Sequence, residues 1–458
     1  MASKIISKNT IPRDVRELLR VLTNHGYEAY IVGGCVRDLV MGIKPADYDI
    51  TTDCRPERTE EIFRKAGFKA VPTGLKFGTV TVISGKGKYE VTTYRKETLY
   101  SDGRRPDKIF FSDTIHEDLK RRDFTINAMA YSPLTEEFID LFDGLKDIRK
   151  KIVRAIGNPE ERFGEDHLRM LRAVRFASRF GYKIEPRTSS AIKKLASKIQ
   201  LISGERVFME LVKMAERSGI DFASSLVLLK KTGLLLHVLP EIDKMDKFKH
   251  GKDAHPEGNV WKHTLGTIKS ACSPNSTLNL ACLFHDIGKV ESFTKEKKGF
   301  SYRNHPLVGV SMIKDIAIRL RMPNELRDIL SFTAENHMKV FRFAEMKTSN
   351  ILKLITHKYW DVLYAVVKAD ALSRLGAYEK EHWKKIDHKI KRLKNEYKTK
   401  SRYEKIRKTI NGDLVMRVKK IPSGKKVGEC IEKTVEWIID NSIDLNDLTS
   451  IANYIREL

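Results

Sequence analysis

Two aspartates one residue apart, Asp47 and Asp49 in the string ADYDITTD, are the side chains whose spacing points most directly to chemistry. In an extended strand, side chains two positions apart point the same way, so both carboxylates would project together from one edge of the strand while Tyr48 and Ile50 face the core. Two carboxylates on one edge can hold a pair of divalent ions, as phosphoryl and nucleotidyl transfer requires. The spacing therefore predicts a catalytic metal site at Asp47 and Asp49.

A glycine pair precedes these aspartates, in the string AYIVGGCVRDLV. Gly33 and Gly34 stand between an apolar run typical of a strand and a predicted helix over 35–41, where free backbone N–H groups favour a phosphate. Each feature alone is common in turns and at strand edges. In this order they resemble the nucleotidyltransferase superfamily that includes DNA polymerase beta. GGCVRD followed by DYDIT is similar to class II tRNA nucleotidyltransferases and bacterial poly(A) polymerases.

The resemblance extends to further residues of the same site. Glu90 in KYEVTTYR is the candidate for the third carboxylate that polymerase-type sites place on a neighbouring strand, although an ordinary strand-edge glutamate fits the pattern equally well. The string RRDFTINA resembles the family's ribose-recognition motif, in which Asp123 would accept a hydrogen bond from a ribose 2′-OH. Arg121 and Arg122 would contact a triphosphate or orient the acid. Nucleotide-binding roles are thereby implied for Gly33, Gly34, Arg37, Arg122, Asp123 and Asn127.

Asp166 and Arg169 lie three positions apart in EDHLRMLRAVRF, which predicts a helix carrying both heads on one face. Cytosine and adenine each offer an amino donor beside a ring-nitrogen acceptor, which match such a pair, whereas uracil and guanine present the reverse. Taken alone, the pair fits an ordinary helix ion pair beside a solvated basic stripe. The whole string resembles the family's EDxLRxLRAxRF motif. That resemblance implies that protein side chains select C and A, with Arg172 and Arg175 also binding the nucleotide.

A second candidate site contains histidines and aspartates that could ligate one metal: His263, the adjacent His285 and Asp286 in ACLFHDIGK, and Asp370. The pattern resembles the HD phosphohydrolase superfamily, which implies a divalent transition metal and hydrolysis of phosphate esters, 2′,3′-cyclic phosphates at RNA ends being one candidate. His305 and His337 could supply a second metal, although each also fits an ordinary polar or capping histidine. A helical scaffold that keeps its ligands without turnover is the competing interpretation.

The elements that must position these residues change character along the chain. Short β-patterned runs such as AYIVG, GTVTVIS and NAMAYS precede residue 140, whereas helical periodicity dominates from about 145. We expect an α+β nucleotidyltransferase head like that of DNA polymerase beta, followed by all-α regions. The predicted segments are the head over 1–140, a base-reading neck over 141–205, a helical body over 206–245, an HD domain over 246–375 and a basic, tRNA-binding tail over 376–458.

The amino-acid composition indicates which kinds of partner the chain binds. Lys and Arg number 85 against 60 Asp and Glu in the 458 residues, a formal net charge of +25 that favours a polyanion. No apolar run approaches a membrane span and no apolar leader is visible, so we expect a cytoplasmic protein without a membrane partner. Five cysteines in no CxxC spacing predict reduced structural thiols. In the tail, KIKRLKNEYKTKSRYEKIRK sets Tyr397 and Tyr403 among basic residues, which predicts phosphate contacts with RNA.

The resemblance implies template-independent addition of CCA to the 3′ end of tRNA from CTP and ATP, with Mg²⁺ at Asp47 and Asp49. The alternative within the family is an A-adding tRNA nucleotidyltransferase or a poly(A) polymerase. PTGLKFGTVTV stands where those polymerases usually carry an Arg-rich stretch, and the loop over 98–119 is undeleted, which favours a tRNA enzyme that adds A. Two alternatives of other classes are an HD phosphohydrolase with an RNA-binding N-terminal half and a non-catalytic RNA-binding protein.

Overall fold

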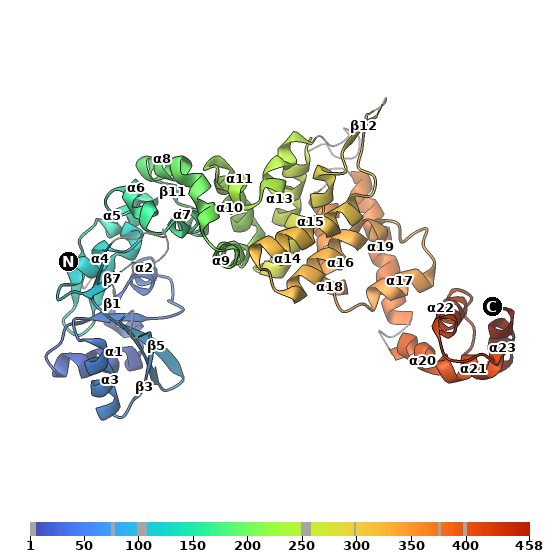
Figure 1. Ribbon diagram of the computed structural model, residues 1–458, viewed down its shortest axis with the longest axis horizontal. Helices are drawn as coiled ribbons and strands as arrows, with labels where there is room; N and C mark the ends of the chain where they lie inside the picture. The colour runs from blue at the N-terminus through green and yellow to red at the C-terminus, as the bar shows by residue number, and fades with distance from the viewer. Residues whose placement is uncertain are drawn as a thin grey trace. The chain divides into compact units, whose positions relative to one another are not determined.

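The computed structural model describes residues 6–74, 78–98, 108–248, 258–296, 299–373, 377–396 and 401–458. The chain folds into two compact units. We call them unit 1, which comprises Met1–Met214 and Ser224–Pro240, and unit 2, which comprises Ala215–Ala223 and Glu241–Leu458. Figure 1 traces the chain from the blue N-terminus to the red C-terminus. No helix in the described ranges is both long and apolar enough to cross a membrane.

The head of unit 1 is built on a seven-stranded sheet of order β3-β4-β5-β2-β1-β8-β9. Its strands are β1 (Ala29–Val32), β2 (Asp49–Thr52), β3 (Lys69–Gly74), β4 (Thr79–Ser84), β5 (Gly87–Thr93), β8 (Met129–Ser132) and β9 (Glu137–Asp140). β2 and β5 pair in parallel and the other neighbours pair antiparallel, so the sheet is mixed. The interior strands β1 and β8 are buried along their whole length. The predicted α+β head is confirmed.

Helices and a hairpin complete the head: α1 (Arg13–Asn24), α2 (Gly34–Val40), α3 (Pro56–Lys65), α4 (Ile115–Lys120), the 3-10 turn η4 (Thr125–Asn127), and β6 (Arg95–Thr98) paired with β7 (Lys108–Phe111). α1 buries Val15, Leu18, Leu19 and Leu22, the spacing of one apolar helix face. α1 and α3 pack together beside the sheet (Figure 1). The loop over 98–119, which we expected to be undeleted, includes residues 99–107 outside the described ranges.

The remainder of unit 1 is mainly helical, as predicted. It contains α5 (Gly144–Lys150), α6 (Pro159–Glu165), α7 (Leu168–Phe180), α8 (Pro186–Leu195), η5 (Ala196–Leu201), most of α9 (Gly204–Ala215), the later part of α10 (Gly219–Lys231), α11 (Leu234–Val238) and a short parallel pair, β10 (Ile152–Val153) with β11 (Lys183–Ile184). The first residues of α10 fall in the segment Ala215–Ala223 of unit 2. α7 ends at Gly181, whose φ of 65° is the left-handed cap that glycine adopts most easily. Ten of the 13 residues of α7 are buried, so this helix runs through the interior of unit 1.

From Glu241 onward, unit 2 contains the rest of α12 (Pro240–Asp243), then η6 (Lys244–Lys247), α13 (Val260–Ala271), α14 (Ser276–Phe284), η7 (Ile287–Val290), α15 (His305–Leu320), α16 (Asn324–Phe341) and α18 (Trp360–Ser373), with a small hairpin of β12 (Thr294–Glu296) and β13 (Gly299–Ser301). α13 packs on α18, and α15 packs on α16 and η7. Gly288 makes the last contact possible, because a Cβ there would lie 2.0 Å from the backbone oxygen of His305.

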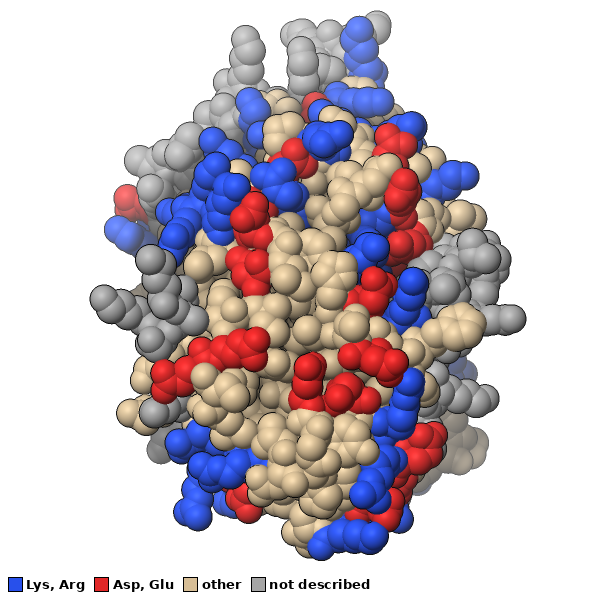
Figure 2. All heavy atoms as spheres, turned by 90° about the vertical axis from the view of Figure 1, so that its left-hand side faces the viewer, with Lys and Arg blue, Asp and Glu red and all other residues tan. Residues whose placement is uncertain are grey.

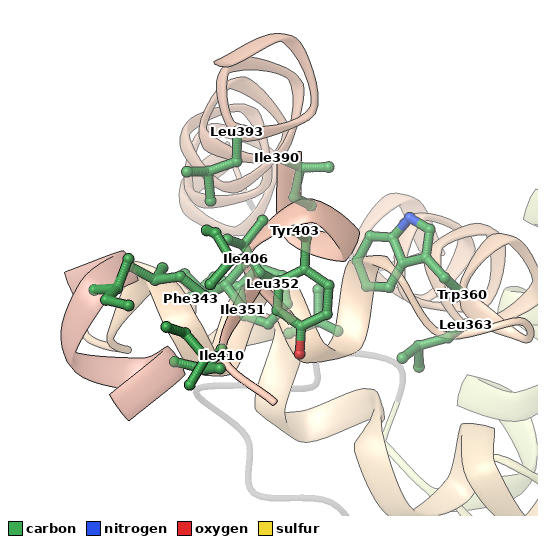
Figure 3. Packing of buried hydrophobic residues seen from close by; sticks show 14 of the residues in the cluster. Phe343, Ile351, Leu352, Trp360, Leu363, Ile390, Leu393, Tyr403, Ile406 and Ile410 are labelled. Atoms are coloured by element: carbon green, nitrogen blue, oxygen red, sulfur yellow. The ribbon is translucent and has the colours of Figure 1, made fainter. Parts of the chain in front are cut away.

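The C-terminal part of unit 2 is a helical array of α17 (Thr348–Ile355), α19 (Ala377–Glu396), α20 (Ser401–Thr409), α21 (Gly412–Lys419), α22 (Lys425–Asp440) and α23 (Leu448–Glu457). One hydrophobic cluster joins these helices to α18 (Figure 3). Tyr403 packs in it beside Leu352 and Ile406 and is only 7% exposed, so its ring serves the core instead of facing RNA. Tyr397 lies outside the described residues.

Candidate active sites

The two aspartates stand at the start of β2. Asp47 precedes the strand and Asp49 is its first residue, so the pair spans the strand's beginning and does not lie wholly inside it. Tyr48 and Ile50 are 8% and 0% exposed, whereas Asp47 is exposed and Asp49 half-buried. This alternation places the two carboxylates on the side away from the core, as the spacing predicts.

Glu90 joins them from the neighbouring strand, because it is the register partner of Asp49 across the parallel pair of β2 and β5. Burial, the negative charge of Asp47 and a smaller contribution from Glu90 raise the pKa of Asp49 to about 6, although Arg122 opposes the shift. Carboxylates that repel one another are stabilised by a cation, and three carboxylates are oxygen ligands of the kind that Mg²⁺ prefers. The donor set therefore fits a divalent metal.

Arg122 lies between this acidic edge and the glycine turn. Gly33 has a φ of 80°, and a Cβ on it would lie 2.6 Å from Nη1 of Arg122. Asp118 is fully buried and accepts hydrogen bonds from Nε and Nη2 of Arg121 at 2.9 and 2.8 Å and from Nη2 of Arg122 at 3.2 Å. Burial would raise the pKa of Asp118, but the two guanidinium charges lower it. Sequence reasoning missed Asp118, although its i+3 and i+4 spacing to two arginines is a recognisable signal.

Asp123 is held by a buried network. Arg172 Nε donates to its Oδ2 at 2.7 Å and Asn127 Nδ2 donates to its Oδ1 at 3.0 Å. Asn127 in turn accepts from Arg37 Nη1 at 2.5 Å, and Arg37, only 3% exposed, also donates to Asp38. Burial would raise the pKa of Asp123, but Arg172 and Asn127 lower it to about 2. Arg37 and Asn127 thus hold the ribose-binding candidate, and Gly34 opens α2 beside them.

The predicted single helix carrying Asp166 and Arg169 is wrong. α6 ends at Glu165 and α7 begins at Leu168, and Asp166 between them has an extended backbone with φ −145°. Oδ1 of Asp166 accepts the backbone N–H of Leu168 at 3.1 Å, and its Oδ2 accepts from Nη2 of Arg206 at 2.9 Å. A carboxylate that caps a following helix competes with helix continuation, which explains the break.

Arg169 and Arg175 are each bound to acidic partners of unit 1. Nη1 of Arg169 donates to Oε2 of Glu165 at 2.5 Å, and its Nη2 donates to the backbone oxygen of Arg121 at 3.1 Å. Nε of Arg175 donates to Oε2 of the buried Glu210 at 2.7 Å. The side chains of Asp166 and Arg169 therefore do not bond to each other. Asp166 is held by Arg206, and Arg169 is held by Glu165 and by the backbone of Arg121.

Six buried side chains meet in unit 2, in two groups. The groups are His263, His285 and Asp370, and Asp286, His305 and His337. Nε2 of His263 and of His285 lie 3.5 and 3.3 Å from Oδ2 of Asp286. Nε2 of His305 and of His337 lie 3.5 and 3.3 Å from its Oδ1. Asp286 therefore faces both groups, as a carboxylate bridging two metal ions does.

The chemistry of these side chains fits metal ligation. Nδ1 of His285, His305 and His337 lies 2.8, 2.9 and 2.8 Å from a backbone carbonyl oxygen, so each Nδ1 is placed to donate there and each Nε2 faces the site, as in a metal-ligating histidine. Nε2 of His285 and Oδ1 of Asp286 are buried without a hydrogen-bond partner among the described atoms. Burial lowers the pKa of His305 to about 4, which keeps its imidazole neutral.

Lys289 is a further residue that sequence reasoning missed. Its Nζ lies 2.6 Å from Oδ2 of Asp286, and the lysine is itself buried. Burial alone would raise the pKa of Asp286, but the charge of Lys289 holds it well below its usual value. The HDIGK string contains this lysine at i+3 from the aspartate, which was the available signal.

The surface charge is not uniform. Figure 2 shows one face of the molecule, on which acidic side chains are interspersed with basic ones among the described residues. The excess positive charge of the chain therefore does not gather into a single basic field on this face.

Three segments match known family models. Residues 29–154 match the poly A polymerase head domain, residues 181–246 match the probable RNA and SrmB-binding site of polymerase A, and residues 260–365 match the HD domain. Together these segments make up more than half of the chain. The chain belongs to the family of class II tRNA nucleotidyltransferases and bacterial poly(A) polymerases. The predicted membership is confirmed, including the HD domain.

Sequence relatives in this family are CCA-adding enzymes. The chain is 47% identical over 208 residues to that of Enterococcus faecalis, covering 45% of this chain and 50% of the relative. It is 48% identical over 197 residues to that of Lactobacillus helveticus, covering 43% of this chain and 48% of the relative. The chain thus spans about half the length of the curated relatives it matches.

Solved structures of the family extend the likeness over the whole chain. The Bacillus stearothermophilus CCA-adding enzyme in complex with CTP has a TM-score of 0.72 and 28% identity, covering 97% of this chain and 96% of that one. The Thermotoga maritima CCA-adding enzyme complexed with tRNA has a TM-score of 0.64 and 21% identity, covering 99% and 97%, and this likeness shows the fold.

Proposed function

We propose that the chain adds C, C and A to the 3′ end of tRNA, using CTP and ATP and no nucleic-acid template. The observation that carries this proposal is the acidic edge formed by Asp49 and Glu90 on adjoining strands and by Asp47 just before β2, with Arg122 beside it. The CCA-adding relatives and the CTP-bound structural neighbour support the same activity. The expected place of action is the cytoplasm.

The head residues divide the work of nucleotidyl transfer. Asp47 and Asp49, with Glu90 as the third carboxylate, would hold Mg²⁺, which supplies charge stabilisation to the attacking and leaving oxygens when bound. Arg122 would contact the triphosphate, and Asp118 keeps its guanidinium oriented. The 3′-hydroxyl oxygen of the tRNA forms a bond to the α-phosphorus of the nucleotide, and the hydroxyl proton passes to a carboxylate of the site. The bond between the α-phosphorus and the oxygen that bridges it to the β-phosphorus breaks, and pyrophosphate leaves.

Sugar and base are chosen by different residues. Asp123, kept ionised by Arg172, would accept a hydrogen bond from the ribose 2′-OH, while Arg37 and Asn127 keep its side chain in place. Asp166 would accept from the amino group of cytosine or adenine and Arg169 would donate to the adjacent ring nitrogen. Arg175, tied to Glu210, would support the same pocket.

The test is a product analysis. Pure protein is incubated with tRNA that lacks CCA, CA or A at its 3′ end, all four NTPs are supplied with Mg²⁺ and a different one is labelled in each reaction, and the products are sequenced. We expect CCA, CA and A to be added, respectively, with no UMP or GMP. Addition of A alone would identify an A-adding enzyme, and long A tracts a poly(A) polymerase; either result would contradict the proposal, as would a lack of any incorporation.

We further propose that the HD residues of unit 2 form a metal-dependent phosphohydrolase site. The observation in its favour is the bridging position of Asp286 between two histidine groups. The residues present fit divalent transition metals, which would activate a water for attack on a phosphate ester when bound. RNA ending in a 2′,3′-cyclic phosphate is the substrate to test first, with metal added back after chelation.

A further inference from the structure

Arg206 makes an unexpected contact with the base-reading aspartate. It lies in α9, and its Nη2 donates to Oδ2 of Asp166 at 2.9 Å. The other oxygen, Oδ1, accepts the backbone N–H of Leu168 at 3.1 Å. Both side chains are mostly buried, 26% exposed for Arg206 and 18% for Asp166. The carboxylate is thus held from two sides, by its own cap and by a residue from another helix.

A second observation concerns the same guanidinium. Nη1 of Arg206 is buried and has no hydrogen-bond partner among the described atoms. A buried donor without an acceptor costs free energy, and a bound ligand that brings an acceptor removes that cost. Arg206 therefore has one N–H group committed to Asp166, and its Nη1 has no acceptor among the described atoms.

We propose that Arg206 is the positioning residue for base selection, an inference that rests on the proposed nucleotide addition. A carboxylate discriminates against uracil only while it stays directed at the C4 position, where uracil has a carbonyl and cytosine an amino group. With Oδ2 tied to Arg206, Asp166 cannot turn away from that carbonyl. Without Arg206, one of its two supports is gone, and the aspartate can rotate and tolerate UTP.

The experiment compares full-length wild type with R206Q, which keeps a polar side chain but loses the charge and the paired donors. CTP and UTP compete in one reaction for tRNA that lacks CCA. The product ratio then gives the kcat/KM for CTP divided by the kcat/KM for UTP. We expect the CTP/UTP ratio to fall about tenfold or more in R206Q, within the range that one mismatched hydrogen-bonding group supplies. R187Q, an exposed arginine of α8 in the same unit, is the matched control and should keep the wild-type ratio.

The ratio separates positioning from general support of the fold, because unfolded molecules add neither nucleotide and leave the ratio unchanged. R206K, which keeps the charge and one donor toward Asp166, should recover most of the selectivity. A wild-type ratio in R206Q overturns the role of Arg206; if R206Q is inactive, a wild-type ratio in R206M, which also lacks the donor to Asp166, overturns it. If the wild type itself adds neither C nor A, the proposed function fails instead.

Discussion

Asp123 shows what single charges contribute in this protein. Its pKa of about 2 lies below the ordinary 3.8, so its ionised form stabilises the fold above pH 4, and this contribution is lost as the pH falls toward 2. The shift corresponds to about 2 kcal/mol. We expect the advantage of wild type over D123N in free energy of unfolding, measured with urea, to shrink by roughly that amount between pH 5 and pH 2.

The control for this prediction is D113N, since Asp113 is an exposed carboxylate of the same unit whose side chain is 85% exposed. Its removal should leave the pH dependence of stability as in the wild type. An advantage of wild type over D123N that stays constant from pH 5 to pH 2 would show that Arg172 and Asn127 do not stabilise the ionised form.

Asp118 acts through the two arginines that it holds. Replacing it by asparagine removes the charge that orients Arg121 and Arg122, so the triphosphate should bind less tightly. We predict that D118N raises the KM for CTP about tenfold, equivalent to about 1.4 kcal/mol, with a smaller effect on kcat. E117Q, on the same helix, should change neither. Steady-state kinetics with tRNA lacking CCA decides this, and an unchanged KM in D118N would refute the orienting role.

At the scale of elements, the contact of η7 with α15 sets the geometry of the HD site. A Cβ at Gly288 would lie 2.0 Å from the backbone oxygen of His305 and 2.5 Å from the N of Gly309, so G288A must push the two elements apart. Asp286 and His305 would then separate. We expect G288A to lose bound metal, measured by elemental analysis of the holoprotein, and to lose phosphohydrolase activity.

The reciprocal substitution is the control. A Cβ at Gly309 would have its nearest neighbour at 3.4 Å, close to an ordinary contact, so G309A should retain both metal and activity. Equal metal content in G288A and G309A would mean that this close approach does not hold the site together.

Several elements were predictable from the sequence and others were not. The runs AYIVG and DYDIT became β1 and β2 because their apolar residues alternate or run continuously. Of the HD ligands, His263, His305, His337 and Asp370 fell on helices, whereas the adjacent His285 and Asp286 lie in the turn between α14 and η7. The break at Asp166 was not predictable from helical periodicity, because the Asp166 carboxylate caps α7 through the backbone N–H of Leu168 and also binds Arg206, 40 residues later in the chain. Tyr403 likewise stands in a basic stretch of the sequence, but its side chain packs in the hydrophobic core with Leu352 and Ile406.

At the scale of the whole molecule, the two candidate sites belong to different compact units. Asp47, Asp49 and Glu90 lie in unit 1, whereas the HD residues lie in unit 2. Each site draws its polar partners from its own unit, so damage to one should leave the chemistry of the other intact. This independence makes a substitution in the HD site the natural control for one in the head.

The most direct test of nucleotide addition at the acidic edge measures extension of tRNA lacking CCA by wild type, D47A and H285A, with sequenced products and tRNA affinity recorded in parallel. Asp47 is exposed, so its replacement should leave the fold intact. We predict CCA addition by wild type and H285A, and none by D47A, which should still bind tRNA as tightly as the wild type. Near-normal addition by D47A would contradict the account.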